Sequence, residues 1–225
     1  MKAFNTLALR SMDCFCVTDF RPQSAFVKMG MGAPPFSSAA THCFFYVEDE
    51  TGLCWNVGMG TVESPYISGV GLEMTSLKGC INNGIFGIKI VRVIRHPCWD
   101  DEPARIAASK FLVWAAKCQE WNLLTRDKVL IRYDWAAFFG YLDSKHRVFT
   151  QDKKKAICSE VPDAVARRFC NTSYTLIPSD APRPPSPWDV EKSCWPSVNN
   201  YLKEEDDVDF TGSISNLEDV ERKEI

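Results

Sequence analysis

Two residues stand out as suited to covalent chemistry: a cysteine at the start of a predicted helix and a histidine at the start of a predicted strand. Cys158 follows the lysine run 153–155 and opens a helix, and both features favour a thiolate over a thiol. His42 opens the aromatic run 42–48 after a loop of small residues, where a sheet can hold an imidazole that still faces a cleft. A thiolate beside an imidazole is the pair that nucleophilic catalysis uses. The structural alternatives are a buried thiol for Cys158 and a hydrogen-bonded core histidine for His42.

The remaining cysteines and histidines do not follow a metal-binding pattern. Of ten cysteines, five lie in apolar or aromatic stretches typical of buried thiols: Cys14, Cys16, Cys43, Cys54 and Cys118. Cys14 and Cys16 are separated by one residue, and no second pair follows at the spacing of a structural zinc site. His96 and His146 resemble ordinary exposed residues. We therefore expect mostly inert thiols, no metal and no cofactor.

The first half of the chain predicts an antiparallel sheet. Stretches rich in aromatic and β-branched residues indicate strands at 14–20, 42–48, 53–57 and 85–94, with shorter pieces at 61–63 and 69–72. The turn residues Asp49 to Gly52 join two of these strands as a hairpin. Glycine, proline and serine over 30–38 indicate an irregular loop. This arrangement puts His42 where that loop enters the sheet.

The second half predicts helices. From Glu102 to Gln119 the period becomes helical, and a stripe of apolar residues is expected to face the core: Ala107, Phe111, Trp114 and Cys118. A shorter helix is expected over 133–142. A third, over 156–169, places Val161, Val165 and Phe169 on one face, with Pro162 tolerated in its first turn.

The C-terminal part changes composition twice. Six prolines fall between residues 178 and 196, which predicts an extended surface segment without helix, docked by Trp188 and Trp195. From residue 203 onward, nine acidic and three basic residues give a charge of −6, against −3 for the chain, so residues 1–202 carry +3. We expect one domain over 1–182, a proline-rich extended segment over 183–202, and an acidic, disordered tail over 203–225.

Composition excludes several classes of protein. Hydrophobic residues at 45% and charged residues at 24% suit a globular core. No apolar run reaches the roughly 18 residues that span a membrane, and the first twelve residues lack the apolar centre of a secretory signal, so we expect a cytoplasmic protein. The mildly basic body has no stripe of clustered lysine and arginine, so there is no strong signal for nucleic-acid binding.

Five short motifs, in this order, resemble the permuted NlpC-type papain-like hydrolases, in particular their YiiX-like branch. They are Thr41-His42, Thr61-Val-Glu63 with Gly69-Val70, Tyr133-Asp-Trp-Ala-Ala-Phe-Phe-Gly140, Cys158-Ser-Glu160 and Ile177-Pro-Ser-Asp180. The resemblance extends over residues 12–182. Thr41, where a smaller residue is usual, is a departure.

The resemblance implies an α+β fold of the circularly permuted papain-like (NlpC-type) kind, with an antiparallel sheet packed against helices. It implies Cys158 as the nucleophile, His42 as its general base and Glu63 as the residue that orients the imidazole; the alternative for Glu63 is a solvated carboxylate at a strand edge. Backbone N–H groups at the start of the Cys158 helix would form an oxyanion hole. Relatives hydrolyse peptide or amide bonds, or lipid esters, and occur in bacteria and their viruses, which suits a phage-encoded protein in the host cytoplasm or virion.

A second interpretation keeps this scaffold without catalysis. The aromatic and proline content of residues 174–202 suits docking to a protein partner. The presence of both His42 and Cys158 argues against this interpretation, because a binding module has little physical need for that pair. The substrate on the first interpretation is a small-molecule, peptide or lipid acyl compound, and the oligomeric state is open.

Overall fold

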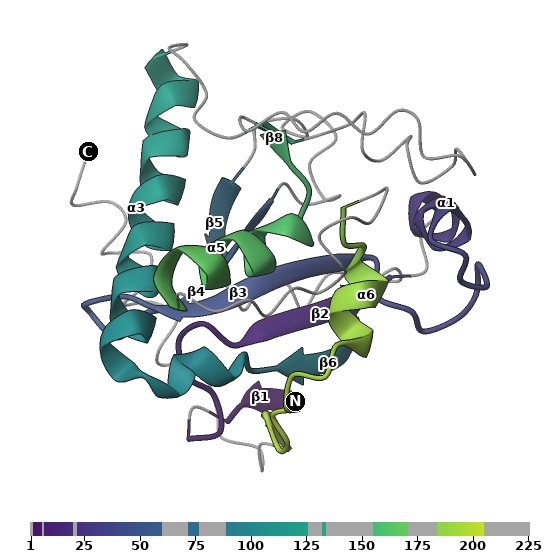
Figure 1. The fold of residues 1–225 in the computed structure, drawn as a ribbon, viewed down its shortest axis with the longest axis horizontal. Coiled ribbons are helices and arrows are strands. Elements are labelled where there is room, and N and C mark those ends of the chain that lie inside the picture. Colours follow the sequence, from purple (N-terminus) through teal and green to yellow (C-terminus); the bar gives the residue numbers. More distant parts are fainter. Residues whose placement is uncertain are drawn as a thin grey trace, which may run out of the picture.

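A five-stranded antiparallel sheet forms the centre of the computed structural model, in the order β5-β4-β3-β2-β6. Its strands are β2 (Cys14–Thr18), β3 (His42–Glu48), β4 (Cys54–Met59), β5 (Leu72–Ser76) and β6 (Lys89–Ile94) (Figure 1). Every neighbouring pair is antiparallel. The predicted hairpin and the strands at its sides are therefore confirmed.

The residues that the structure describes are 2–5, 7–19, 22–59, 72–76, 89–125, 132–133, 155–170 and 184–204. Two smaller sheets accompany the central one. In the first, β1 (Lys2–Phe4) pairs antiparallel with β9 (Leu202–Glu204). In the second, β7 (Arg132–Tyr133) pairs parallel with β8 (Lys155–Ala156). Tyr133, the first residue of the helix predicted over 133–142, therefore lies in a strand. The other residues of that predicted helix lie outside the described ranges.

Alternation along β3 separates two apolar cores, one on each face of the sheet. Cys43, Phe45 and Val47 belong to the larger core, while Phe44 and Tyr46 belong to the smaller one. Side chains alternate across a strand, so a run of aromatic residues can fill both faces at once. This buried strand is what fixes His42 and Cys43 on opposite sides of the sheet.

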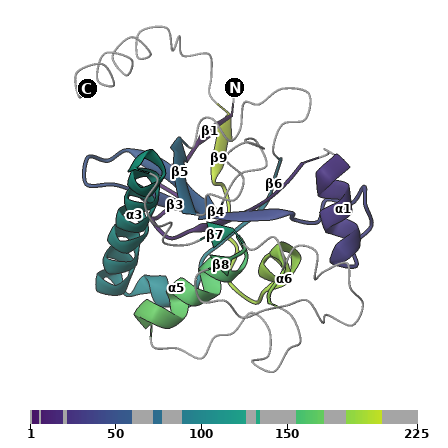
Figure 2. The same cartoon turned by 90° about the horizontal axis from the view of Figure 1, so that it is seen from above.

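Helices cover the larger core, and the β1–β9 pair lies on the other side of the sheet (Figure 2). The helices that contribute to this core are α3 (Glu102–Thr125), α5 (Glu160–Cys170) and α6 (Pro187–Lys192). The short 3-10 helix η1 (Pro97–Asp100) precedes α3. The sequence did not indicate α1 (Pro22–Gly30), which leads into the loop expected over 30–38. The chain is thus of the α+β class. Across the described ranges no helix is long and apolar enough to cross a membrane.

The buried face of α3 differs from the predicted stripe. The residues that reach the core are Ala108, Leu112, Ala115 and Ala116, whereas Ala107 is exposed and Trp114 keeps 58% of its surface exposed. The prediction was wrong because it followed the largest side chains. Small alanines let the helix approach the sheet closely, and Phe111 packs at the edge against Phe169, 5.5 Å between ring centroids.

The proline-rich segment holds a helix, which corrects the expectation of extended chain. Ser186 caps α6: its hydroxyl accepts the N–H of Asp189, whose carboxylate accepts the N–H of Ser186. Pro187 occupies the first helical position, where a missing N–H costs nothing. The docking predicted for Trp195 is confirmed, since it is buried in the larger core. The expected tail begins inside β9, and its residues 205–225 lie outside the described ranges.

Arg92 of β6 fastens this C-terminal segment to the sheet. Its guanidinium donates to the carbonyl oxygens of Glu191, Ser193 (3.2 Å) and Trp195 (3.0 Å), and its Nε donates to the Ser197 hydroxyl at 2.8 Å. A planar guanidinium can serve several acceptors at once. The segment after α6 is therefore part of the packing that surrounds β2 and β6.

Candidate functional site

Cys158 lies in a tight turn between β8 and α5, two residues before the helix begins at Glu160. The Glu160 carboxylate accepts the N–H of Ile157 at 2.8 Å, and the Glu160 N–H donates to the Ile157 carbonyl at 3.1 Å. Ser159 donates its hydroxyl to the carbonyl of Pro185 at 2.5 Å, which ties the turn to the segment before α6. The predicted placement of Cys158 at a helix start is confirmed.

Burial is the main influence on the pKa of the Cys158 thiol, and it opposes formation of a thiolate. The residue is 4% exposed, and desolvation raises its pKa to about 12. Backbone hydrogen bonds from Cys43, Ser159 and Cys158 itself act in the opposite direction without overcoming it. The expectation of a poised thiolate is therefore wrong for this arrangement. Removing the sulfur from water destabilises the thiolate by more than the three backbone N–H groups stabilise it.

His42 occupies the first position of β3 and faces the smaller core. Its partner on β2 is Val17, a member of that core, and its ring lies 6.3 Å from that of Phe44. Cys158 belongs to the larger core on the opposite face. The structure therefore does not bring the imidazole and the Cys158 sulfur together on one face. The backbone N–H of Cys43, the residue after His42, is instead the group of β3 that lies close to the Cys158 sulfur.

The other residues of the resemblance fall mainly outside the described ranges. Glu63, the expected orienting residue, is one of them, as are Asp134 and the motif at 177–180. Tyr133 lies in β7. The described part of the chain thus contains two of the three expected catalytic residues, His42 and Cys158.

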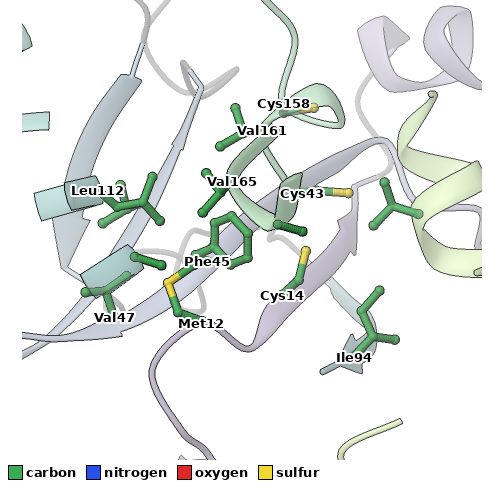
Figure 3. Packing of buried hydrophobic residues seen from close by; sticks show 14 of the residues in the cluster. Met12, Cys14, Cys43, Phe45, Val47, Ile94, Leu112, Cys158, Val161 and Val165 are labelled. Atoms are coloured by element: carbon green, nitrogen blue, oxygen red, sulfur yellow. The ribbon is translucent and has the colours of Figure 1, made fainter. Parts of the chain in front are cut away.

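Three cysteine sulfurs gather beneath Cys158. Cys14 and Cys16 share one face of β2 because they are two residues apart, and Cys43 on β3 is the register partner of Cys16. The three sulfur atoms lie within 4.8 Å of one another, and all three side chains are buried. Figure 3 shows Cys14 and Cys43 on adjacent strands with Cys158 above them. Sequence spacing missed this cluster, since it depends on the pairing of two strands.

The three sulfurs share hydrogen bonds that separate their pKa values. Hydrogen bonds from Cys14 and then Cys43 lower the pKa of Cys16 to about 5, with help from the nearby Arg92 guanidinium. The hydrogen bond with Cys16 raises the pKa of Cys14, while burial raises that of Cys43. The Cys43 thiol also donates to the carbonyl of Pro187 at 3.9 Å. The cluster therefore favours a thiolate at Cys16 over one at Cys14 or Cys43.

A second cysteine–histidine group lies at the start of η1. His96, expected to be exposed, is 1% exposed, and its Nδ1 accepts the N–H of Cys98 at 3.1 Å. Its ring packs edge-on against Trp195, with centroids 4.6 Å apart. Cys98 is bonded to Cys170 at the end of α5 in a disulfide, an exception to the expected free thiols. With both sulfurs in that bond, this group has no thiolate to offer a metal.

An open cavity of about 680 Å³ lies elsewhere, between α3 and the β3–β4 turn. Its lining includes Glu48, Glu50, Arg105, Lys110 and Trp114. Lys110 is paired with Glu50 at 3.3 Å. No cysteine or histidine lines this cavity, so it offers none of the groups expected for acyl transfer.

No protein-family model matches the chain, and neither the search of curated proteins nor that of solved structures gives a match.

Proposed function

We propose that this chain is a thiol-dependent hydrolase or acyltransferase with Cys158 as its nucleophile, built on a circularly permuted papain-like fold. The supporting features are an antiparallel sheet packed against helices, and a histidine strand that precedes the cysteine helix in the sequence. The order of the motifs and the α+β class agree with this fold.

One observation carries the proposal. The backbone N–H of Cys43 lies close enough to the Cys158 sulfur to lower the pKa of that thiol, although the two residues are far apart in the sequence. The start of β3, where His42 lies, and the turn before α5 therefore meet at one point. The turn that holds Cys158 and the strand that begins with His42 are therefore neighbours, which supports a shared site although the two side chains lie on opposite faces of the sheet.

The reaction would proceed through an acyl-cysteine. The Cys158 proton passes to His42, the sulfur attacks the acyl carbon, and the leaving amine or alcohol departs with that proton. Water or another acceptor then attacks the thioester and releases the acyl group, which restores the thiol. The N–H groups of Cys158 and Ser159, in the turn just before α5, would stabilise the oxyanion.

Catalysis on this scheme requires a rearrangement. Cys158 must become accessible, and the His42 side chain must turn round the end of β3 to reach the opposite face. His42 is the first residue of its strand, and the residues before it are also held: the Thr41 N–H donates to the Val17 carbonyl at 2.8 Å, and the Ala40 N–H donates to the Glu191 carboxylate at 2.7 Å. The rearrangement therefore has to break these bonds. On this proposal, the conformation described above, with Cys158 buried, is the resting state. An acyl substrate, whether peptide, amide or lipid ester, would stabilise the rearranged conformation in which Cys158 is accessible.

Turnover of a panel of activated esters, thioesters and peptide amides tests the proposal. We expect an acyl group on the peptide that contains Cys158, detected by mass spectrometry after acid quenching. C158S should abolish turnover, and H42A should lower kcat/KM by about 10²–10⁴-fold, the usual contribution of a general base. The matched control is C194S, which removes an exposed free thiol and should change nothing.

A second candidate function is a non-catalytic scaffold that binds a protein partner. Two observations favour it: the burial of Cys158 and the placement of His42 on the opposite face. Failure of the whole panel to turn over or to acylate Cys158 would favour this function. Turnover that survives in C158S would contradict the proposed nucleophile.

A further inference from the structure

We propose that Cys14, Cys16 and Cys43 form a buried three-sulfur site for a soft metal ion, with Cu(I) as the ion that best suits it. This site is separate from the acyl-transfer function proposed for Cys158. It rests on the juxtaposition of three sulfur atoms within 4.8 Å of one another, contributed by adjacent strands in fixed register.

The spacing is close to what a metal requires. Three sulfurs bound to one ion at about 2.3 Å lie roughly 3.8–4.0 Å apart. The present limit of 4.8 Å therefore leaves less than about 1 Å of contraction, which rotation of cysteine side chains can supply without moving the strands. Paired strands hold Cys16 and Cys43 opposite each other, so the backbone is already in position.

The surroundings select a soft ion. Thiolate ligands favour Cu(I), Zn²⁺ and iron–sulfur clusters over hard cations. Structural zinc takes four ligands, whereas Cu(I) accepts three sulfurs in a plane. Cys158, which interacts electrostatically with Cys14, is not among the three sulfurs that lie mutually within 4.8 Å. Three ligands in an apolar core thus point to Cu(I).

A positive charge lies beside the cluster. Arg92 is the register partner of Cys16 across β2 and β6. Three thiolates with Cu(I) carry a net charge of −2, which burial would disfavour without a nearby cation. The guanidinium offsets part of it while its N–H groups stay bonded to the chain after α6.

Metal binding by the full-length protein tests the site. The chain with its Cys98–Cys170 disulfide intact would be produced in copper-supplemented cells, assayed for metal content, and titrated anaerobically with Cu(I) against a chromogenic Cu(I) chelator. We expect one Cu(I) per chain. X-ray absorption on the loaded wild-type protein should report three sulfur neighbours at about 2.3 Å. This measurement does not depend on any variant folding.

Variants assign the ligands. C14A, C16A and C43A should each weaken Cu(I) binding by more than the roughly 10- to 100-fold that losing an outer-sphere partner costs. The matched controls are C54S and C158S. Each removes a free cysteine outside the three-sulfur site and leaves Cys14, Cys16 and Cys43 in place, so each should bind Cu(I) as the wild type does. Near-ultraviolet circular dichroism checks the fold of each variant.

Three results would overturn the inference. They are a chain empty of copper after both production and titration, nitrogen or oxygen neighbours in place of sulfur, and tight Zn²⁺ binding that C158S abolishes. The last would make Cys158 a fourth ligand and would also remove it as a nucleophile. Loss of Cu(I) binding in C14A, C16A or C43A with turnover retained would leave the proposed acyl-transfer function intact.

Discussion

Alkylation of Cys158 in the resting protein should be slow and should keep accelerating as the pH rises. Burial moves the pKa of this thiol from its ordinary 9.0 to about 12. At pH 7 its thiolate fraction is then about a thousandfold lower than that of an unperturbed thiol, since each pKa unit is a factor of ten. Restricted access of the reagent to a residue that is 4% exposed lowers the rate further.

The assay is iodoacetamide labelling between pH 7 and pH 10, quenched with acid and read at each cysteine-containing peptide by mass spectrometry. The rate at Cys158 should rise about tenfold per pH unit over the whole range. Cys194, an exposed free cysteine, is the internal reference for reagent quality, and circular dichroism at each pH checks for alkaline unfolding.

H42A is the matched variant for this experiment. Because the imidazole lies on the opposite face of the sheet, its removal should leave the Cys158 labelling profile unchanged. A plateau of the wild-type rate below pH 8 would refute the argument, since it would mean a thiolate stabilised by a partner. A profile that shifts in H42A would identify that partner as the imidazole.

Three further predictions concern stability. L112A should cost about 2–5 kcal/mol of unfolding free energy in urea, whereas W114A, two residues along α3, should cost less than about 1 kcal/mol because its ring is 58% exposed; equal costs would contradict the buried face of α3. Reducing the Cys98–Cys170 disulfide, which links residues 72 apart, should lower stability by about 4 kcal/mol in the same assay, and an unchanged midpoint would show that the bond constrains nothing. Because the pKa of Cys158 is raised to about 12, the folded chain keeps a proton that the unfolded chain loses above pH 9, and the free energy of unfolding therefore falls between pH 9 and pH 12. Relative to C158A, the wild type should lose up to about 4 kcal/mol of this free energy across that range. Parallel pH profiles of the two proteins would refute the shift.

Local periodicity predicted the elements better than it predicted their faces. The aromatic strand at 42–48, the helix from Glu102 and the helix after Cys158 all follow from residue patterns a few positions long. The buried face of α3 did not, because residue size suggested Trp114 while close packing required alanines. Similarly, the prolines before α6 indicated extended chain, although one of them fits the first turn of a helix.

The candidate site was predictable in its parts and not in its assembly. Sequence placed Cys158 before a helix and His42 at the start of a strand, and both positions are confirmed. It could not show that alternation along β3 turns the imidazole to one face while Cys158 packs on the other. The sulfur cluster was hidden for the same reason, since only the register of β2 and β3 places Cys43 opposite Cys16.

The pairing of β1 with β9 has a consequence for the order of the chain. Lys2 lies opposite Glu204, so the first and last described strands are neighbours (Figure 2). A short linker could close the backbone there, and new ends could be opened in the β3–β4 turn with little loss of packing. In such a ring the histidine strand and the cysteine helix keep their places while their sequence order changes. The sequence order of these two elements then depends only on where the circular backbone is opened. A circularly permuted chain that folds would show that the core tolerates either order.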